Sequence, residues 1–178
     1  MDDIRVCSNQ NLTHDKLSFN VRQIQNITPL YAKKVLEQRY KNKLYGNLYV
    51  TGVDQIELAE TISQHPNDNS FVIDVAYSLV GTIYFKDMKL AFCFDNLINV
   101  NGASYFKKDN VFAIVNNIEI NESEKKINGV EKPILIVHVI SEPNYWPEPS
   151  GLRIGLICEI ERLIEDSEEA RAAYNVTV

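Results

Sequence analysis

The sequence predicts an α+β fold: a mostly antiparallel β-sheet, two helices in the N-terminal half, and a long C-terminal amphipathic helix packed on the sheet. Stretches of alternating apolar and polar residues fill the middle of the chain, which is the period of half-buried strands. Apolar residues recur at helical spacing near the C-terminus. Consecutive strands joined by short connections predict hairpins, and hairpins favour antiparallel pairing.

The first predicted elements are a strand at 16–24, a helix from about Pro29 to Tyr40, and a short strand at 44–52. Apolar and polar residues alternate along the first strand. Thr28 is a favourable N-cap, and a proline suits the first helical position because the amide it lacks would have no intrahelical partner. The first helix therefore has defined bounds.

A second, shorter helix is predicted directly after the strand at 44–52. Asp54 and Glu57 have the spacing of a capping box. Ile56, Ala59 and Ile62 follow at i, i+3 and i+6, which places them on one helical face.

The middle of the chain predicts strands in pairs. A strand at 71–80 is followed by a hairpin within 81–95, and a second hairpin joins 111–120 to 133–141. The segment 133–141 is apolar at both parities, so it predicts a central strand that is buried on both faces.

The C-terminal helix is predicted from Gly151 to about Tyr174, with Ser150 as its N-cap. Its apolar residues stand at i, i+1, i+4, i+7 and i+8, namely Leu156, Ile157, Ile160, Leu163 and Ile164. Charged residues occupy the other side, which predicts a helix with one face on the sheet and one in water.

Length and composition predict one globular domain, residues 1–178, whose first 15 residues are irregular or flexible. The chain has 178 residues, 45% of them hydrophobic and 24% charged. A net charge of −6 opposes binding to a phosphate backbone, so we expect no nucleic-acid partner. The N-terminal residues do not resemble a secretory signal, and no apolar run approaches the length of a membrane span, so we expect a cytoplasmic protein without a membrane partner.

Cofactor and metal motifs are missing from the sequence, which predicts neither a cofactor nor a metal. Cys7, Cys93 and Cys158 are odd in number and far apart, which argues against a disulfide framework or a zinc site. His14 and His65 show no metal-ligand spacing.

Three residues are candidates for catalysis. His138 lies late in the predicted central strand, where we interpret it as a hydrogen-bonded core histidine. Cys93 could be a nucleophile activated by His138, but a small buried residue beneath a packed helix is the simpler interpretation. Asp74 could belong to a polar sheet face suited to acid and base chemistry, together with Asp95, Asn117 and Glu119.

The best candidate for binding is the segment "SEPNYWPEPSG" at 141–151, which holds three of the six prolines and the single tryptophan. Prolines restrict the backbone, so Tyr145 and Trp146, with Glu142 beside them, would lose little entropy on binding. The alternative is that Trp146 folds back and caps the core where a strand meets a helix.

These features predict a non-catalytic protein-binding or assembly protein that has a protein partner or associates with itself. Inhibitors, immunity-type or antitoxin-type partners and subunits of viral or bacterial assemblies all fit an acidic chain rich in tyrosine. The alternative is a small hydrolase or transferase with a site on the polar sheet face near Asp74 and Cys93, or around His138.

Overall fold

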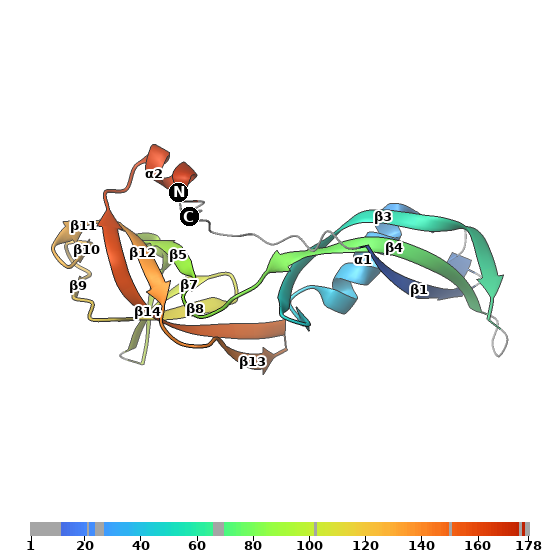
Figure 1. Cartoon of the computed structure of the whole chain (residues 1–178), viewed down its shortest axis with the longest axis horizontal. Helices are drawn as coiled ribbons and strands as arrows, with labels where there is room; N and C mark the ends of the chain where they lie inside the picture. Colours follow the sequence, from blue (N-terminus) through green and yellow to red (C-terminus); the bar gives the residue numbers. More distant parts are fainter. Residues whose placement is uncertain are drawn as a thin grey trace. The chain divides into compact units, whose positions relative to one another are not determined.

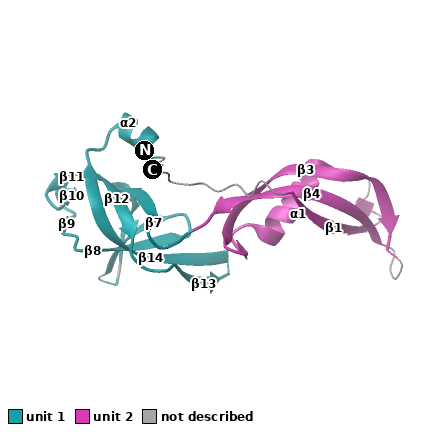
Figure 2. Cartoon of the chain, in the orientation of Figure 1, with its two compact units in different colours: residues 1–4, 84–178 teal, residues 5–83 magenta. Residues whose placement is uncertain are grey.

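The computed structural model describes residues 12–20, 22–23, 27–65, 70–101, 103–149, 151–174 and 176. Of these described residues 59% are in strands, so the fold is mostly β, and two α-helices occur among them. It divides into two compact units: the described residues up to Ile83 belong to unit 2, and those from Tyr84 onward to unit 1 (Figure 2). The single domain predicted from the chain length stays a prediction, since two compact units can still unfold together.

Unit 2 is a four-stranded antiparallel sheet with one helix against it (Figure 1). The strand order is β1-β4-β3-β2. Its elements are β1 (Thr13–Asn20), α1 (Pro29–Tyr40), β2 (Leu44–Tyr45), β3 (Leu48–Gln64) and β4 (Ser70–Thr82). The predicted strand at 71–80 is confirmed, and the first strand is confirmed with an earlier start and an end at Asn20. The single strand predicted at 44–52 is two strands, β2 and the start of β3, joined by a turn. Of the segment 1–15, which was predicted to be irregular, residues 1–11 lie outside the described residues.

The predicted first helix is confirmed at both ends. The Thr28 hydroxyl accepts a hydrogen bond from the backbone N–H of Tyr31 at 3.2 Å, which satisfies one of the free amides of the first turn. Asp15 on β1 holds the other end of the helix, because its carboxylate accepts a hydrogen bond from Arg39 and one of 3.0 Å from the Tyr40 hydroxyl.

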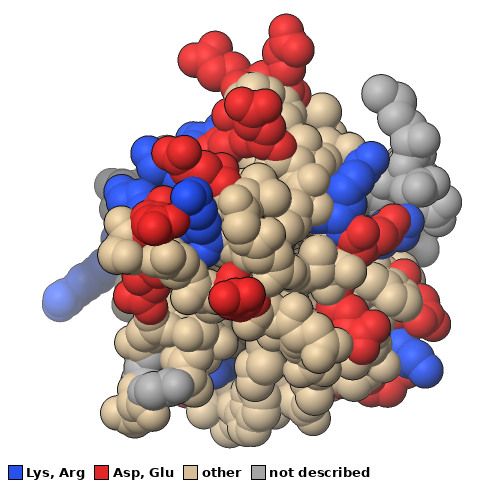
Figure 3. Space-filling model, turned by 90° about the vertical axis from the view of Figure 1, so that its left-hand side faces the viewer, with Lys and Arg blue, Asp and Glu red and all other residues tan. Residues whose placement is uncertain are grey.

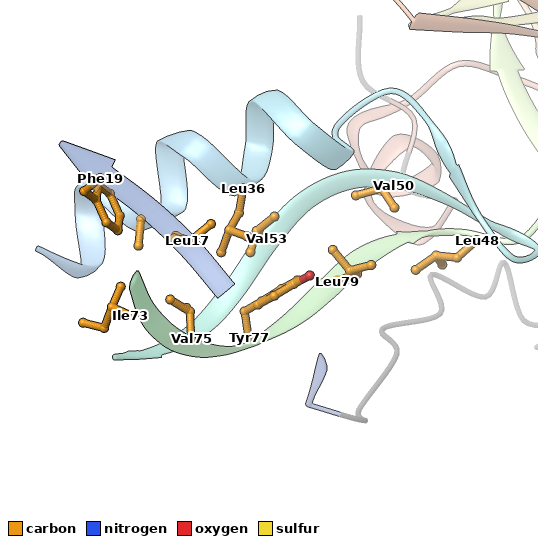
Figure 4. Packing of buried hydrophobic residues seen from close by; sticks show 11 residues of the cluster. Leu17, Phe19, Leu36, Leu48, Val50, Val53, Ile73, Val75, Tyr77 and Leu79 are labelled. Carbon is orange, nitrogen blue, oxygen red and sulfur yellow. The ribbon is translucent and has the colours of Figure 1, made fainter. Parts of the chain in front are cut away.

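The core of unit 2 lies between α1 and one face of the sheet (Figure 4). Alternate residues of β4 and β1 point into it, as the period of a strand requires. The buried residues are Leu17, Phe19, Ala32, Leu36, Leu48, Val50, Val53, Ile73, Val75, Tyr77 and Leu79.

The predicted second helix at 54–64 is wrong, because these residues form the second half of β3. The register of β3 against β4 shifts between Asp54 and Glu57 and again between Leu58 and Ile62. Each shift inserts residues that have no partner on β4. The inserted residues spread the apolar positions from a spacing of two to a spacing of three or four, which imitates a helix.

Unit 1 contains a curled mixed sheet in which β5, β12, β14, β8, β7 and β6 follow one another in that order, while β13 also pairs with β14. The 3-10 helix η2 (Phe94–Asn96) alone separates β5 from β6 in the chain, yet these strands stand at the two ends of the order. The sheet therefore curls into a half barrel. The strands are β5 (Lys89–Cys93), β6 (Leu97–Val100), β7 (Ala103–Lys108), β8 (Val111–Asn116), β12 (Ile134–Val139), β13 (Asn144–Glu148) and β14 (Gly151–Ile164).

Three short strands and one short helix complete unit 1. The segment between β8 and β12 forms a small sheet of β9 (Ile120–Asn121), β10 (Lys126–Ile127) and β11 (Val130–Glu131). The helix α2 (Glu168–Ala173) follows β14.

The inner face of the half barrel holds much of the core of unit 1. Phe92 and Phe106 meet there with their ring centroids 5.7 Å apart. The buried residues of β8 and β14 alternate along each strand; they are Val111, Ala113, Val115, Ile154, Leu156 and Cys158.

The long C-terminal helix is also wrong, because residues 151–164 form β14 and only Glu168–Ala173 are helical. β14 is hydrogen-bonded to β12 and β13 on one side and to β8 on the other, the last pair being parallel. Its register against β12 shifts between Ile160 and Arg162, which reverses the inward and outward positions. The predicted N-cap, Ser150, lies outside the described residues.

Neither predicted hairpin forms. β4 and β5 belong to different units and do not pair with each other, and residues 83–88 connect them. β8 pairs with β7 and β14, whereas β12 pairs with β5 and β14. The prediction for 133–141 is confirmed in its main point, since β12 has a neighbour on each side and five of its six residues are buried.

Candidate interaction surface

Trp146 lies on β13 at the edge of the half barrel, with 48% of its surface exposed. Its ring packs flat against Gly155 of β14, so closely that a Cβ atom at Gly155 would overlap with the ring atoms Cζ3 and Cη2. The tryptophan therefore does not cap the core. It is a partly exposed aromatic ring held on the outer face of the sheet.

Tyr145 does not share this face with Trp146. Tyr145 pairs with Ile154, whose side chain is fully buried on the inner face, and successive side chains of a strand alternate between faces. Burial and, to a smaller extent, the nearby Glu142 carboxylate raise the pKa of Tyr145. Glu142 itself is exposed, and Tyr145 and Trp146 point to opposite faces of β13.

The outer face continues from Trp146 through Gly155 to Phe112, because Gly155 pairs with Phe112 of β8. Two cations lie over the Phe112 ring: the Arg153 guanidinium carbon is 4.5 Å from its centroid and the Lys107 ammonium 5.4 Å. Such contacts between a cation and an aromatic face are attractive.

Tyr105 of β7 and Ile114 of β8 extend the same surface. The Tyr105 and Phe112 rings are 5.7 Å apart, and Ile114 is 52% exposed. Ile157 pairs with Ile114, and its neighbours Leu156 and Cys158 are buried on the inner face, so Ile157 belongs to the outer one. We call this surface the aromatic face; it consists of Tyr105, Lys107, Phe112, Ile114, Trp146, Arg153 and Ile157.

The charged side chains of the molecule are distributed unevenly. Figure 3 shows one side, where acidic residues gather toward the top and uncharged surface dominates the lower centre. On the aromatic face Arg153 is ion-paired with Glu148 of β13. The two charged groups that lie over the Phe112 ring are positive, although the net charge of the chain is negative.

The candidate catalytic residues belong to different parts of the fold, and the two that lie in unit 1 are far apart on their strands. Asp74 lies in unit 2, where its carboxylate is 3.9 Å from the Lys16 ammonium, whereas Cys93 and His138 lie in unit 1. Cys93 pairs with Ile134 and His138 with Lys89, four residues apart on both strands. At about 3.3 Å per residue this puts roughly 13 Å between the two positions, too far for an imidazole to activate the thiol.

Each of these residues has an ordinary structural environment. Cys93 is buried, and its Sγ lies 3.1 Å from Oδ1 of Asn96. Residues of the C-terminal segment pack over Cys93, which confirms the interpretation as a buried residue beneath a helix. His138 Nε2 is 3.3 Å from Asp87 Oδ1, and 37% of the histidine side chain is exposed, so its interpretation as a core residue is wrong.

Searches for a metal site and for a membrane span give no candidate in the described ranges. No three His, Cys, Asp or Glu side chains in them are arranged to hold a metal ion. Neither helix described in the structure has the length and apolarity needed to cross a bilayer. Cys7 lies outside these ranges.

Sequence reasoning missed most of the aromatic face. The signal was present in "VFAIV", 111–115, where apolar residues occupy both parities. We interpret such a pattern as burial on both faces, but Ile114 shows that one face is open. The cations are invisible to this pattern, because Lys107 and Arg153 reach Phe112 from different strands.

The chain matches no protein-family model, and a search of curated proteins returns no significant match.

Proposed function

We propose that this chain is a non-catalytic protein-binding or assembly subunit and that the aromatic face of unit 1 is its contact surface. One observation carries the proposal: Ile114 of β8 and Trp146 of β13 are each about half exposed on the same face of one sheet, and β14 lies between their strands. Large apolar side chains that lie together in water mark contact surfaces.

The composition of this face suits a protein interface. Tryptophan, tyrosine and arginine are the residues that most often dominate binding energy, and all three occur here. Arg153 and Glu148 form an ion pair at its edge, which gives the apolar centre a polar rim. Trp146 is preorganised because Gly155 leaves room for its ring, so little conformational entropy is lost on binding.

A substitution in the centre of the face tests the proposal. Ile114→Asp places a charge where a partner would bury an apolar side chain, so an affinity capture from the native source should lose its partner at least about tenfold. Leu30→Asp is the matched control, because Leu30 is 78% exposed on α1 and an acidic residue is favourable in a first helical turn. Both variants must retain the wild-type unfolding midpoint. Equal capture by wild type and Ile114→Asp would refute the assignment of the surface.

One further measurement tests whether the protein associates with itself through the same face. Sedimentation of the wild-type protein over a hundredfold range of concentration would reveal a dimer that Ile114→Asp abolishes and Leu30→Asp retains. A dimer unaffected by Ile114→Asp would place the self-association surface elsewhere.

A second candidate function is binding of single-stranded nucleic acid, which the net charge argues against. The specific observation in its favour is the Phe112 ring, which has Tyr105 beside it and two cations over it. Bases stack on such rings while cations attract the backbone. Without β13, and with β5 and β6 counted as one interrupted strand, the curled sheet has five strands. Partly open five-stranded barrels include many oligonucleotide binders, although a fold alone does not establish a function.

Titration with a labelled single-stranded 12-nucleotide RNA and DNA separates the two candidates. If this function holds, binding weakens with salt, and Phe112→Ala loses about 1 to 3 kcal/mol, the usual contribution of one stacked base. Absence of binding at low salt would exclude this candidate and leave the protein-binding proposal intact. The hydrolase or transferase alternative gains no support from Cys93 and His138, because their positions are roughly 13 Å apart within unit 1.

A further inference from the structure

The chain turns back after β14 and lays its last described residues on the sheet. The described residues 165–174 and 176, which we call the strap, include α2. Ala170, Tyr174 and Val176 of the strap pack on residues of β5 and β12. The residues beneath them form an apolar strip, namely Ala91, Cys93, Ile134 and Ile136, each 7% exposed or less.

The backbone hydrogen bonds of the strap are internal. The Arg171 N–H donates to the Ser167 carbonyl at 2.9 Å, the Tyr174 N–H to Ala170 at 3.0 Å, and the Val176 N–H to Arg171 at 3.0 Å. Across the described residues, no backbone hydrogen bond joins the strap to the sheet.

The polar side chains follow the same pattern, with one exception. The Arg171 guanidinium binds the Asp166 carboxylate at 2.6 Å, within the strap. Arg162 of β14 donates to the Tyr174 hydroxyl and lies over its ring, so it is a side-chain tie between strap and sheet. Three apolar side chains and this tie hold the strap down, together with the attraction of Asp166 to Lys132 and of Arg171 to Asp95.

We propose that the strap opens as a unit while the half barrel stays folded, and that opening uncovers the apolar strip and the Cys93 thiol. Opening breaks no ladder hydrogen bond, and a helix of six residues has little stability of its own, so the segment belongs to the low-stability end of the fold. The strip is then a second, cryptic apolar surface, distinct from the aromatic face.

Opening also couples thiol chemistry to the position of the strap. Cys93 is 1% exposed with the strap closed, so an adduct on its sulfur would occupy the volume that the strap side chains fill. A modified Cys93 therefore holds the strap open. This inference does not depend on the proposed function, because it concerns contacts within unit 1.

Cys158 provides an internal control. It is also fully buried, but it lies on the inner face of β14, where the strap does not reach. Burial raises the pKa of its thiol to about 12, so the folded state protects it from reaction at neutral pH. Its labelling therefore reports opening of the barrel, whereas labelling of Cys93 reports opening of the strap.

The test uses the wild-type protein, N-ethylmaleimide and mass-spectrometric mapping of the two cysteines, with each rate divided by its rate in the unfolded chain. If the strap opens by itself, the normalised rate of Cys93 should exceed that of Cys158 roughly 100-fold or more. The Cys93 rate should also depend little on sub-denaturing urea. Equal normalised rates with equal urea dependence would overturn the proposal, because both thiols would then require unfolding of the barrel.

Variants locate the effect on the strap. Tyr174→Ala should raise the Cys93 rate at least about tenfold and leave the Cys158 rate within about twofold. Glu165→Gln is the matched control in the strap, because Glu165 is exposed and precedes α2, so both rates should stay unchanged. A Tyr174→Ala protein whose two rates rise together, or do not rise at all, would contradict the strap.

Discussion

A methyl group at Gly155 is expected to displace Trp146 without disturbing the rest of β14. The Cβ of Gly155→Ala would lie inside van der Waals contact of two atoms of the tryptophan ring, and the ring is held on an edge strand with water on its other side. The ring can move outward, whereas the backbone of β14 is paired with strands on both sides. We therefore expect the ring to leave its place.

The cost follows from the contact area. Trp146 is 48% exposed, so about half of the 150 to 250 Å² that a tryptophan can bury is covered, or roughly 100 Å². At about 25 cal/mol per Å² the lost contact is worth about 2.5 kcal/mol. Alanine is favoured over glycine within a strand by about 0.5 to 1 kcal/mol. The free energy of unfolding should therefore fall by about 1.5 to 2 kcal/mol.

The assay combines urea unfolding with the emission of the single tryptophan. Emission of Gly155→Ala should shift to the red and become more accessible to acrylamide. In the Trp146→Ala background, Gly155→Ala should be neutral or slightly stabilising, because no ring remains to clash. Gly52→Ala is the control, since nothing lies within 4 Å of a Cβ built there. Unchanged emission together with an unchanged unfolding midpoint in Gly155→Ala would show that the ring does not pack on Gly155.

Three other substitutions or deletions test the fold. Asp15→Asn should lower the free energy of unfolding by about 1 kcal/mol in urea titrations, because it weakens the partly exposed pair with Arg39; no change would show that the pair is not formed in solution. A chain ending at Ile164 should unfold cooperatively by circular dichroism, whereas one ending before Gly151 should not fold, because β14 joins three other strands; the reverse order of stability would contradict the topology. The hydrogen bond from Arg171 lowers the pKa of Asp166, so this pair stabilises the fold above the ordinary aspartate pKa of about 3.9 and loses its effect as the pH falls through the lower folded value. The free energies of unfolding of wild type and Asp166→Asn should therefore differ at pH 7 and converge in acid. A difference that persists in acid would show that Asp166 acts through packing and not through its charge.

The first helix was predictable because its signals are local. The Thr28 cap and the proline after it act within one turn, and the structure contains that same hydrogen bond. The strands with unbroken alternation, such as β4, were predictable for the same reason.

The two wrong helices have one physical cause. Register shifts in β3 and β14 insert residues without a partner, so apolar side chains that all reach a core are no longer two positions apart. In β14, Ile160 stands before the shift and Leu163 after it, and the interval of three between them imitates a helical turn. A shift is defined by the partner strand, which a local pattern does not contain.

The pairing of strands depends on contacts between distant segments. β8 pairs in parallel with β14, about 40 residues later in the chain, and no turn residue announces such a contact. The candidate site has the same limit, because it also depends on distant segments. Trp146 was predicted from the nearby prolines and because it is the single tryptophan, whereas the position of Phe112 on the same face follows only from the pairing of β8 with β14.

The most direct test of the aromatic face as a contact surface is a ¹⁹F NMR spectrum of protein carrying 5-fluorotryptophan at its single tryptophan position, recorded alone and with the captured partner. The isolated protein should show one resonance with a large solvent-isotope shift, because Trp146 is half exposed. Adding the partner should move or broaden that resonance and reduce the isotope shift, as burial of the ring requires. A resonance that is unchanged in the presence of a saturating partner would contradict the account.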